Sequence, residues 1–330
     1  MYLDNIIFLQ FALIIQEKGR CLAELFRSAT DMFAKRYYVN GEAVKPARAH
    51  AQTLIYRLPR KERGNTMDRE SPIAVMDSGV GGISVLSELV KLMPRENFIY
   101  YGDSANAPYG TKNKSVVLDI TRRNLEALME GGAKASVIAC NTATSAAAGQ
   151  LRAEYPNFTI IGIEPAIKPA SILFSNPRVL VMATPLTLHE EKFQNLCRKY
   201  AEYEEIIPLP CPGLVELIED GKLDCEETDT YLRELFAPHL EQKIDAVVLG
   251  CTHYPHIKTA IARCLPLRTT ILDGGEGTAR ETFRRVKEAG LLNPSETAGD
   301  IQMINSSDDE RLIDLSWELH ERGVGRKMRG

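Results

Sequence analysis

The chain has 330 residues, 44% of them apolar and 25% charged, so it is long enough to bury a sizeable core and to form two domains. A net charge of -4 gives no general attraction to nucleic acid or to an anionic membrane, and we expect neither as a partner. The seven cysteines lack disulfide-like regularity and form no C-x-x-C pair, which predicts a reducing, cytoplasmic location.

The first 66 residues fit the rest of the chain poorly. The apolar run at residues 6–15 is too short to span a bilayer, and the acidic Asp4 precedes it in place of a basic segment. The stretch that follows is basic, rich in turn formers and without a clear apolar period. We therefore expect residues 1–66 to be an N-terminal extension, with three interpretations open: a disordered segment, an amphipathic appendage, or sequence upstream of a true start at Met67.

From Pro72 onward, short apolar runs alternate with helical patterns, which is typical of a parallel sheet built from βαβ units. Strands are expected at residues 73–77, 97–102, 136–140, 178–184, 205–210 and 246–251. Helices are expected at residues 83–92, 115–130 and 143–154, with another starting near His256. The segment from residue 269 onward is again typical of a strand, a glycine turn and a helix, and we expect it to complete the first domain.

The spans 75–140 and 181–251 follow one pattern, so the sequence predicts two pseudo-symmetric, three-layer α/β domains with parallel sheets. Ligands collect at the carboxyl ends of strands in such sheets, which predicts an active site at the domain interface. We expect the first domain to comprise residues 67–165 plus 273–330 and the second to comprise residues 166–272.

Two cysteines stand out because their surroundings are alike. Cys140 in "VIACNTAT" and Cys251 in "VVLGCTHYP" each follow a short apolar run and open a hydroxyl-rich turn. A thiol at the carboxyl end of a buried strand faces a cleft and lies beside the N–H groups of the next helix, which favour the thiolate. Two such thiols can face one substrate from opposite sides. The alternative is that both are small buried hydrophobes, as free cysteines usually are.

We assign the remaining cysteines a structural role, because no cluster of Thr, Asn or His accompanies them. They are Cys21, Cys197, Cys211, Cys225 and Cys264.

Two further segments offer groups that can hold a small anion. "IAVMDSGVGG" places Asp77, Ser78 and three glycines between a strand and a helix, where free backbone N–H groups can bind a carboxylate. Its spacing fits neither a dinucleotide-binding turn nor a P-loop, so a nucleotide is disfavoured; a plain tight turn capped by Asp77 is the alternative. "GDSANAPYGTK" reads as a loop in which Tyr109 and Gly110 offer a phenol and a bare backbone amide, or as an ordinary connection.

Polar residues also follow each thiol directly. Asn141, Thr142 and Thr144 accompany Cys140, whereas Thr252 and His253 accompany Cys251. A histidine two residues from a thiol can stabilise the thiolate or relay its proton. The pattern C-x-H has too few ligands for a metal site, so no metal is expected.

Two thiols, many hydroxyl and amide donors and no cofactor motif favour proton transfer at a carbon α to a carboxylate. One thiolate removes the proton, and the opposed thiol delivers a proton to the other face. That reaction is a racemisation or an epimerisation that needs no cofactor.

Taken together, these motifs resemble the glutamate racemases, cofactor-independent isomerases that supply D-glutamate for peptidoglycan and hence for cell wall biogenesis and cell shape. The resemblance runs from about Ile73 to about Arg284 and rests on "DSGVGG", "YGDSANAPYG", "CNTAT", "EPAIKPA", "CPGLVELIEDG", "LGCTHYP" and "LDGGEGTAR". It implies two α/β domains with the site at their interface, which agrees with the repeat described above.

The resemblance also implies roles for individual residues. Cys140 acts as the base toward D-glutamate and Cys251 as the base toward L-glutamate, while Asp77 assists the first thiol and His253 the second. Substrate contacts are implied for Asp77, Ser78, Tyr109, Gly110, Asn141, Thr142, Thr144, Thr252 and His253. Asp103 and Glu219 match acidic positions of the family motifs and are expected to support the site.

Other interpretations remain open at this point. A racemase for aspartate or hydantoins would belong to the same superfamily, although an acidic residue would then be expected in place of His253. A single thiol with His253 as its base would suit acyl transfer, but would leave Cys140 without a role. A non-catalytic amino-acid-binding protein would need neither thiol. Glutamate is the expected small-molecule partner, and a homodimer is a further expectation.

Overall fold

The computed structural model describes residues 68–189, 191–201 and 205–325. The predictions for the N-terminal extension at residues 1–66, for a start at Met67 and for Cys21 lie outside these residues. None of the helices in the described part of the chain is both long and apolar enough to cross a membrane.

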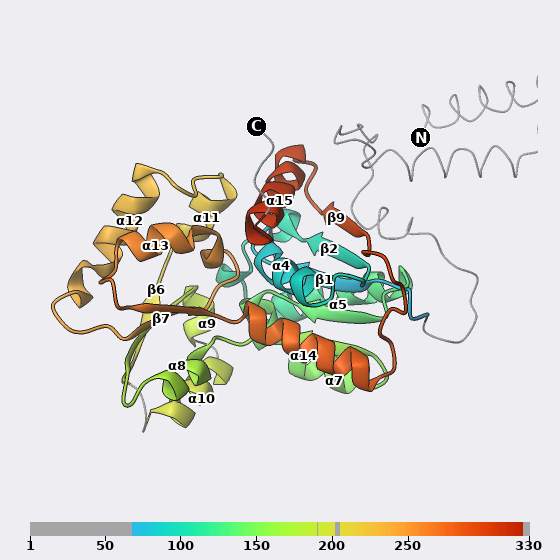
Figure 1. Ribbon diagram of the computed structural model, residues 1–330, viewed down its shortest axis with the longest axis horizontal. Helices are drawn as coiled ribbons and strands as arrows, with labels where there is room; N and C mark the ends of the chain where they lie inside the picture. The colour runs from blue at the N-terminus through green and yellow to red at the C-terminus, as the bar shows by residue number, and fades with distance from the viewer. Residues whose placement is uncertain (1–67, 190, 202–204, 326–330) are drawn as a thin grey trace, which may run out of the picture. The chain divides into compact units, whose positions relative to one another are not determined.

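The first sheet contains the three strands predicted at residues 73–77, 97–102 and 136–140, together with two strands that were not predicted, β4 and β9. They are β1 (Ile73–Asp77), β2 (Phe98–Gly102), β3 (Ala135–Ile138), β4 (Thr159–Gly162) and β9 (Ile301–Asn305). All neighbouring pairs are parallel, in the order β4-β3-β1-β2-β9 (Figure 1). Strand β3 ends two residues earlier than predicted, so Cys140 lies in the turn after it.

The second sheet repeats this arrangement. Its strands are β5 (Arg178–Ala183), β6 (Glu205–Pro210), β7 (Ala246–Leu249) and β8 (Thr270–Asp273), all parallel and in the order β6-β5-β7-β8. That order matches β2-β1-β3-β4 of the first sheet, with β3 and β7 in equivalent places. The predicted pair of α/β domains is therefore confirmed, and β9 is the one strand of the first sheet without an equivalent among the described strands of the second.

Helices cover the faces of both sheets, as parallel strands require. Around the first sheet lie α4 (Ile83–Leu92), α5 (Lys114–Glu130), α7 (Gly149–Glu154), α14 (Gly275–Glu288) and α15 (Glu310–Gly323), of which α14 and α15 pack on α4. Around the second lie α8 (Ile167–Leu173), α9 (Pro185–His189), α10 (Glu191–Tyr200), α11 (Leu214–Glu219), α12 (Glu226–Phe236) and α13 (Lys258–Arg263). Figure 1 shows α11, α12 and α13 on one side of this sheet, with α8 and α10 on the other.

Buried apolar side chains form three clusters, and the largest joins the two sheets. It includes Val75 and Tyr100 from the first sheet together with Leu249, Cys251 and Tyr254 from the second. A second cluster, with Cys140, covers the other face of the first sheet, and a third covers the other face of the second. Dense packing of this kind resists deformation, so the shared cluster holds the strand ends of both sheets in one arrangement.

The helix predicted at residues 143–154 is not continuous. A short turn, α6 (Asn141–Ala143), leads into π-helical residues Thr144–Ala148 before α7 begins. Wide turns of this kind occur often at functional sites. The strand expected from residue 269 is β8, and it pairs with β7 of the second sheet, so the expectation that this strand completes the first domain is wrong; the helix after it, α14, does pack on α4. The domain boundaries at 67–165 plus 273–330 and 166–272 stay a proposal.

Candidate active site

The carboxyl ends of β1, β3 and β7 come together between the two sheets. Asp77 is the last residue of β1, and Cys140 and Cys251 each lie two residues beyond β3 and β7. The hydroxyl of Thr252 donates a hydrogen bond to Asp77 Oδ2 at 3.0 Å, and Ser84 Oγ donates to the Thr252 carbonyl at 2.8 Å. These bonds bring the turn that carries Cys251 against the glycine turn after β1.

Cys140 caps the short helix α6. Its sulfur accepts a hydrogen bond from the Ala143 N–H at 3.4 Å and lies 3.6 Å from Ser78 Oγ. Burial, reinforced by the negative charge of Asp77, raises the pKa of the Cys140 thiol to about 12. The Ala143 N–H at the helix start favours the thiolate as expected, and so does the Ser78 hydroxyl, but together they do not offset the loss of water, so the net shift of the pKa is upward.

Cys251 has a different neighbour, the imidazole of His253. His253 Nδ1 lies 3.6 Å from Cys251 Sγ, and Nε2 lies 2.9 Å from Glu219 Oε1. Burial by itself lowers the pKa of His253, but the hydrogen bonds and charges of Cys251 and Glu219 outweigh burial and raise the pKa well above its usual value. The buried imidazole is thus held in its positive form beside the thiol.

Glu219, at the end of α11, supports His253 from the same half of the molecule, because α11 follows β6 and His253 follows β7. Burial raises its pKa, but the hydrogen bond and the positive charge of His253 prevail, so the pKa of this carboxyl is lower than usual. The Val80 N–H also donates to Glu219 Oε1 at 3.4 Å. A Cβ at Gly79 would overlap Glu219, and one at Gly81 would overlap the His253 ring, so the glycine turn lets these side chains approach its backbone.

Asp77 lies close to Ser78, which contacts Cys140, and to Thr252 and His253, which follow Cys251. Burial raises its pKa, while the charge of His253, the Gly79 N–H and the Thr252 hydroxyl act in the opposite direction. Ser78 Oγ lies at 3.5 Å from Asp77 Oδ1 and contacts Cys140 as well. The carboxyl group is therefore placed to influence the Cys140 thiol through charge and through Ser78.

The loop after β2 contributes Asp103 and Tyr109. The Tyr109 hydroxyl donates to Asp103 Oδ2 at 2.6 Å, and Asn124 Nδ2 donates to the same oxygen at 2.9 Å. Burial and the charge of Asp103 raise the pKa of Tyr109, so the phenol stays protonated. Gly110 lies close to Thr184, since a Cβ at Gly110 would be 3.1 Å from Thr184 Cβ.

Three threonine hydroxyls link α6 to the segment after β5. Thr142 Oγ1 lies 3.3 Å from Thr184 Oγ1 and 3.1 Å from Thr187 Oγ1, which are 3.0 Å apart. The sequence analysis did not identify Thr184 or Thr187. The internal repeat was the available signal, because β5 occupies the place of β1 in the second sheet and Thr184 follows β5 as Ser78 follows β1. Thr144 is used differently: its hydroxyl donates to the Ile138 carbonyl at 2.9 Å.

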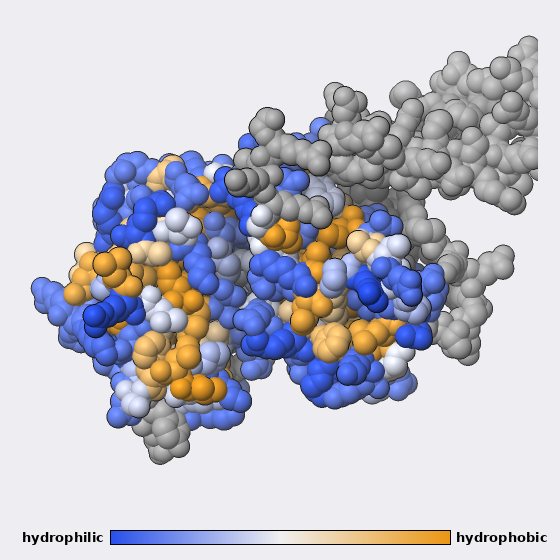
Figure 2. Space-filling model, in the orientation of Figure 1, coloured by the Kyte–Doolittle hydropathy of each residue, from blue (hydrophilic) through white to orange (hydrophobic). Residues whose placement is uncertain are grey.

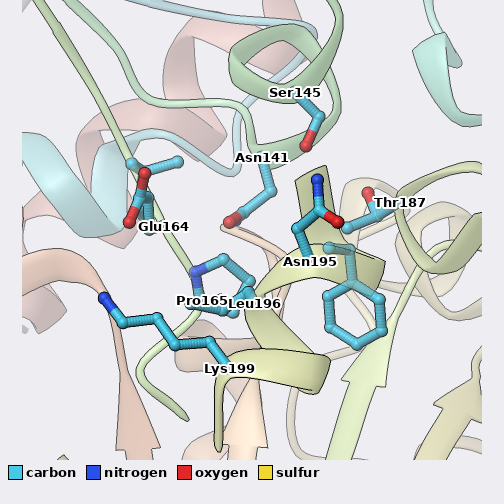
Figure 3. Close-up of a pocket in the computed structure, with 10 residues that line it drawn as sticks. Asn141, Ser145, Glu164, Pro165, Thr187, Asn195, Leu196 and Lys199 are labelled. Carbon is cyan, nitrogen blue, oxygen red and sulfur yellow. The ribbon is translucent and has the colours of Figure 1, made fainter. Parts of the chain in front are cut away.

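Asn141 faces a cavity of about 210 Å³ (Figure 3). Asn141 is only 5% exposed, yet neither its Nδ2 nor its Oδ1 has a hydrogen-bond partner among the described residues. Thr187, Glu164 and Lys199 also line the cavity, whereas neither Cys140 nor Cys251 does. A buried amide without partners is costly, so this side chain is suited to a polar ligand or to water.

The other cysteines among the described residues form no disulfide bond. Cys211 is buried in the shared cluster and donates to the Leu209 carbonyl at 3.3 Å, while Cys197, Cys225 and Cys264 are partly exposed. Their structural role stays a prediction. Among the described residues no three His, Cys, Asp or Glu side chains are placed to hold a metal ion.

Comparison with known proteins identifies the family. The model of the Asp/Glu/Hydantoin racemase family matches residues 73–282. The chain belongs to this family. It is accordingly an enzyme of the isomerase class.

Relatives within the family are similar over most of their length. The glutamate racemase of Clostridium perfringens is 48% identical over 253 residues, which covers 77% of this chain and 97% of the relative. That of Clostridium acetobutylicum is 50% identical over 254 residues, covering 76% and 98%.

Solved structures of glutamate racemases share the fold. The Francisella tularensis enzyme, in complex with D-glutamate, has a TM-score of 0.66 at 27% identity and covers 79% of this chain and 96% of its own. The Escherichia coli enzyme, in complex with L-glutamate and the activator UDP-MurNAc-ala, has a TM-score of 0.67 at 29% identity, covering 76% and 95%.

Proposed function

We propose that this protein interconverts L- and D-glutamate without a cofactor by a two-thiol mechanism. The observation that carries the proposal is that Cys140 and Cys251 follow equivalent strands of the two sheets and both lie against the glycine turn after β1: Thr252 next to Cys251 donates to Asp77, and Cys140 contacts Ser78. Relatives about half identical over three quarters of the chain are glutamate racemases, which favours glutamate over aspartate as the substrate.

Each turnover moves one proton to the substrate and one from it. With L-glutamate, the Cys251 thiolate removes the α-proton, and the electron pair left on Cα is delocalised into the adjacent carboxylate. The Cys140 thiol then gives its proton to the opposite face of Cα, so D-glutamate leaves a Cys140 thiolate and a Cys251 thiol. The reverse direction exchanges the two roles, and no proton or charge is lost in the cycle.

The electrostatics of the site favour the reaction that starts from L-glutamate. The raised pKa of Cys140 keeps it as a thiol, and the positively charged His253 lies 3.6 Å from Cys251 Sγ. A Cys140 thiol is the proton donor that the reaction of L-glutamate requires. Asp77 assists proton transfer at Cys140, directly or through Ser78, and Glu219 maintains the positive charge of His253.

Neutral donors hold the substrate in this proposal. Hydroxyls and amides bind carboxylates without adding a fixed positive charge that would oppose protonation of a thiol at each turnover. The proposed neutral contacts are Ser78, Tyr109, Gly110, Asn141, Thr142, Thr144 and Thr252, joined by the neighbouring Thr184 and Thr187. The family motifs also imply contacts from two groups that carry charge, Asp77 and His253. The unpartnered amide of Asn141 supports this, because a carboxylate beside it would satisfy its Nδ2.

The finer biological context is also part of the proposal. D-glutamate produced in the cytoplasm would supply peptidoglycan synthesis, and through it cell wall biogenesis and cell shape. A homodimer is retained as an expectation.

Solvent exchange tests the function directly. The purified protein is incubated with L-glutamate, and separately with L-aspartate, in D₂O without pyridoxal phosphate or metal, while optical rotation and deuterium at Cα are followed. We expect loss of rotation with deuterium incorporation for glutamate alone. Turnover of aspartate would indicate the related racemase instead, and absence of exchange with either amino acid would contradict cofactor-independent, unassisted catalysis.

A further inference from the structure

Strand β9 distinguishes the first half of the molecule from the second. It pairs with β2 so that Asn305 lies opposite Gly102, and it comes after the residues that the family model matches. Gly102 is the last residue of β2, so the end of β9 reaches the point where the loop carrying Asp103 and Tyr109 begins. Strand β6, the equivalent of β2, is bordered by no further strand among the described residues.

Asn305 donates a hydrogen bond to this loop and lies close to the glycine turn. The side chain is almost fully buried; its Nδ2 donates to Ser104 Oγ at 2.9 Å, and its Oδ1 accepts from the Ser307 N–H at 2.8 Å. At Gly102 a Cβ would lie 2.7 Å from the Gly79 carbonyl oxygen and 3.0 Å from Asn305 Nδ2. Asn305 therefore packs where the backbones of both active-site segments come close together.

Ser306 holds the next residues of the loop. Its N–H donates to the Gly102 carbonyl at 2.8 Å, and its Oγ accepts from the Ala105 N–H at 2.9 Å. Ala105 lies in an exposed 3₁₀ turn, Ser104–Asn106, so this hydroxyl supplies a fixed partner on an otherwise open side. On the inner side, the Asp103 N–H donates to the Asp77 carbonyl at 2.9 Å.

We propose that Asn305 and Ser306 are positioning residues that hold the loop at residues 103–109 in register with the glycine turn. Neither residue acts on the substrate itself. Each acts through Asp103, whose carboxylate fixes the Tyr109 hydroxyl beside the Cys140 side of the site. This inference rests on the proposed function, in which Tyr109 contacts glutamate. Small displacements of positioned groups reduce catalysis, by as much as about 100-fold for a shift of about 1 Å.

Ser306 provides the cleaner test, because it is only partly buried, whereas Asn305 is almost fully buried; the Ser306 side chain also forms a hydrogen bond with the buried Tyr101, and Ser306→Thr controls for that contact. Ser306→Ala removes the acceptor of the Ala105 N–H, and Ser306→Thr retains it. Gln302→Ala, on the exposed face of the same strand, is the matched control. Amide hydrogen exchange of residues 103–111 is measured by mass spectrometry, together with KM, kcat and the thermal midpoint for each variant.

We expect Ser306→Ala to increase amide exchange in residues 103–111 and to raise the KM for glutamate about three- to tenfold, the effect of one hydrogen bond, with a smaller change in kcat. Ser306→Thr should restore both values, and Gln302→Ala should change neither. Asn305→Ala should act in the same direction with a larger effect.

Two results would overturn the inference. Unchanged exchange of the loop in Ser306→Ala would show that the residue does not hold it, whatever the activity. Increased exchange with unchanged KM and kcat would show that the loop does not position the substrate. Failure of the proposed function is separate: a wild-type protein inactive toward glutamate would remove the kinetic readout, while the exchange measurement would still decide whether Ser306 holds the loop.

Discussion

The two thiols occupy equivalent places in the two sheets but have unlike neighbours. Cys140 lies beside a hydroxyl and an acid, Ser78 and Asp77, and burial raises its pKa to about 12. Cys251 lies beside an imidazole that Glu219 keeps positive. A symmetric topology thus supports two sites of opposite electrostatic character, which suits one thiol to give a proton while the other takes one.

The difference arises in the segments that follow the equivalent strands. After β1 the chain makes the glycine turn, whereas after β5 it continues into Thr184 and α9. After β2 it forms the loop with Asp103, whereas after β6 it passes through Gly213 into α11, which ends at Glu219. Repetition of the strand order therefore fixes where the thiols lie, and the unlike turns decide which charged and polar groups surround each thiol.

Removing either thiol should have the largest effect, because each direction of the reaction needs both. We expect Cys140→Ala and Cys251→Ala each to reduce racemisation by at least about 10³-fold, measured by polarimetry, within the range for loss of an acid or base. Each variant should still eliminate HCl from the chloroglutamate enantiomer that its remaining thiol reaches. Cys225→Ala serves as the control, and full racemase activity in either active-site variant would exclude the two-thiol scheme.

A second contrast between the halves concerns stability. Before β3, Lys134 and Glu96 form a fully buried ion pair at 2.5 Å, whereas before β7 the partner of Asp245 is Lys243, an exposed side chain. Glu96→Gln should lower the free energy of unfolding by about 3–5 kcal/mol, because it leaves a buried ammonium without its counter-charge. Lys243→Ala should lower it by less than about 1 kcal/mol. Denaturant unfolding measures both, and equal losses would contradict the contrast.

The pH dependence should separate the two thiols. The imidazolium of His253, whose folded pKa is raised, attracts a Cys251 thiolate below that pKa and loses this effect as the pH rises through it. His253→Asn should therefore shift the acidic limb of kcat/KM to higher pH and reduce the maximum about 10²-fold. Asp77→Asn removes a charge that raises the pKa of Cys140, so it should shift the alkaline limb to lower pH.

These opposite shifts are measured with L-glutamate across the full pH range. A matched control is Glu88→Gln, an exposed carboxyl on α4 paired with Lys91, which should leave both limbs unchanged. Shifts of the same sign in the His253 and Asp77 variants would show that the two thiols do not differ as described.

The smallest effect is expected at the hydroxyls that link the halves. Thr187→Val removes a group that lies 3.1 Å from Thr142 and 3.0 Å from Thr184 while keeping the shape of the side chain. We expect KM for glutamate to rise about two- to tenfold, in line with the loss of one hydrogen bond. Thr187→Ser should restore most of the binding. Unchanged KM in Thr187→Val would indicate that the cluster serves packing alone.

The strands and both thiols were predictable because their signals are local. A short apolar run indicates a buried parallel strand, and glycine or hydroxyl residues after it indicate the turn. The positions of Asp77, Cys140 and Cys251 at strand ends could therefore be predicted from neighbouring residues alone. Helix boundaries such as Ile83–Leu92 followed for the same reason. The π-helical turn at Thr144–Ala148 did not, since its residues differ little from those of an ordinary helix.

By itself the sequence determined two parallel α/β halves, the strand-end position of both cysteines and, through its motifs, the family. Only the tertiary structure decided that Glu219 pairs with His253, that Thr184 and Thr187 join Thr142, and that the C-terminal strand braces the loop after β2. It also reversed the expected direction of the Cys140 pKa. Periodicity and turn chemistry act between near neighbours in the chain, whereas burial and charge depend on which distant segments the fold brings together.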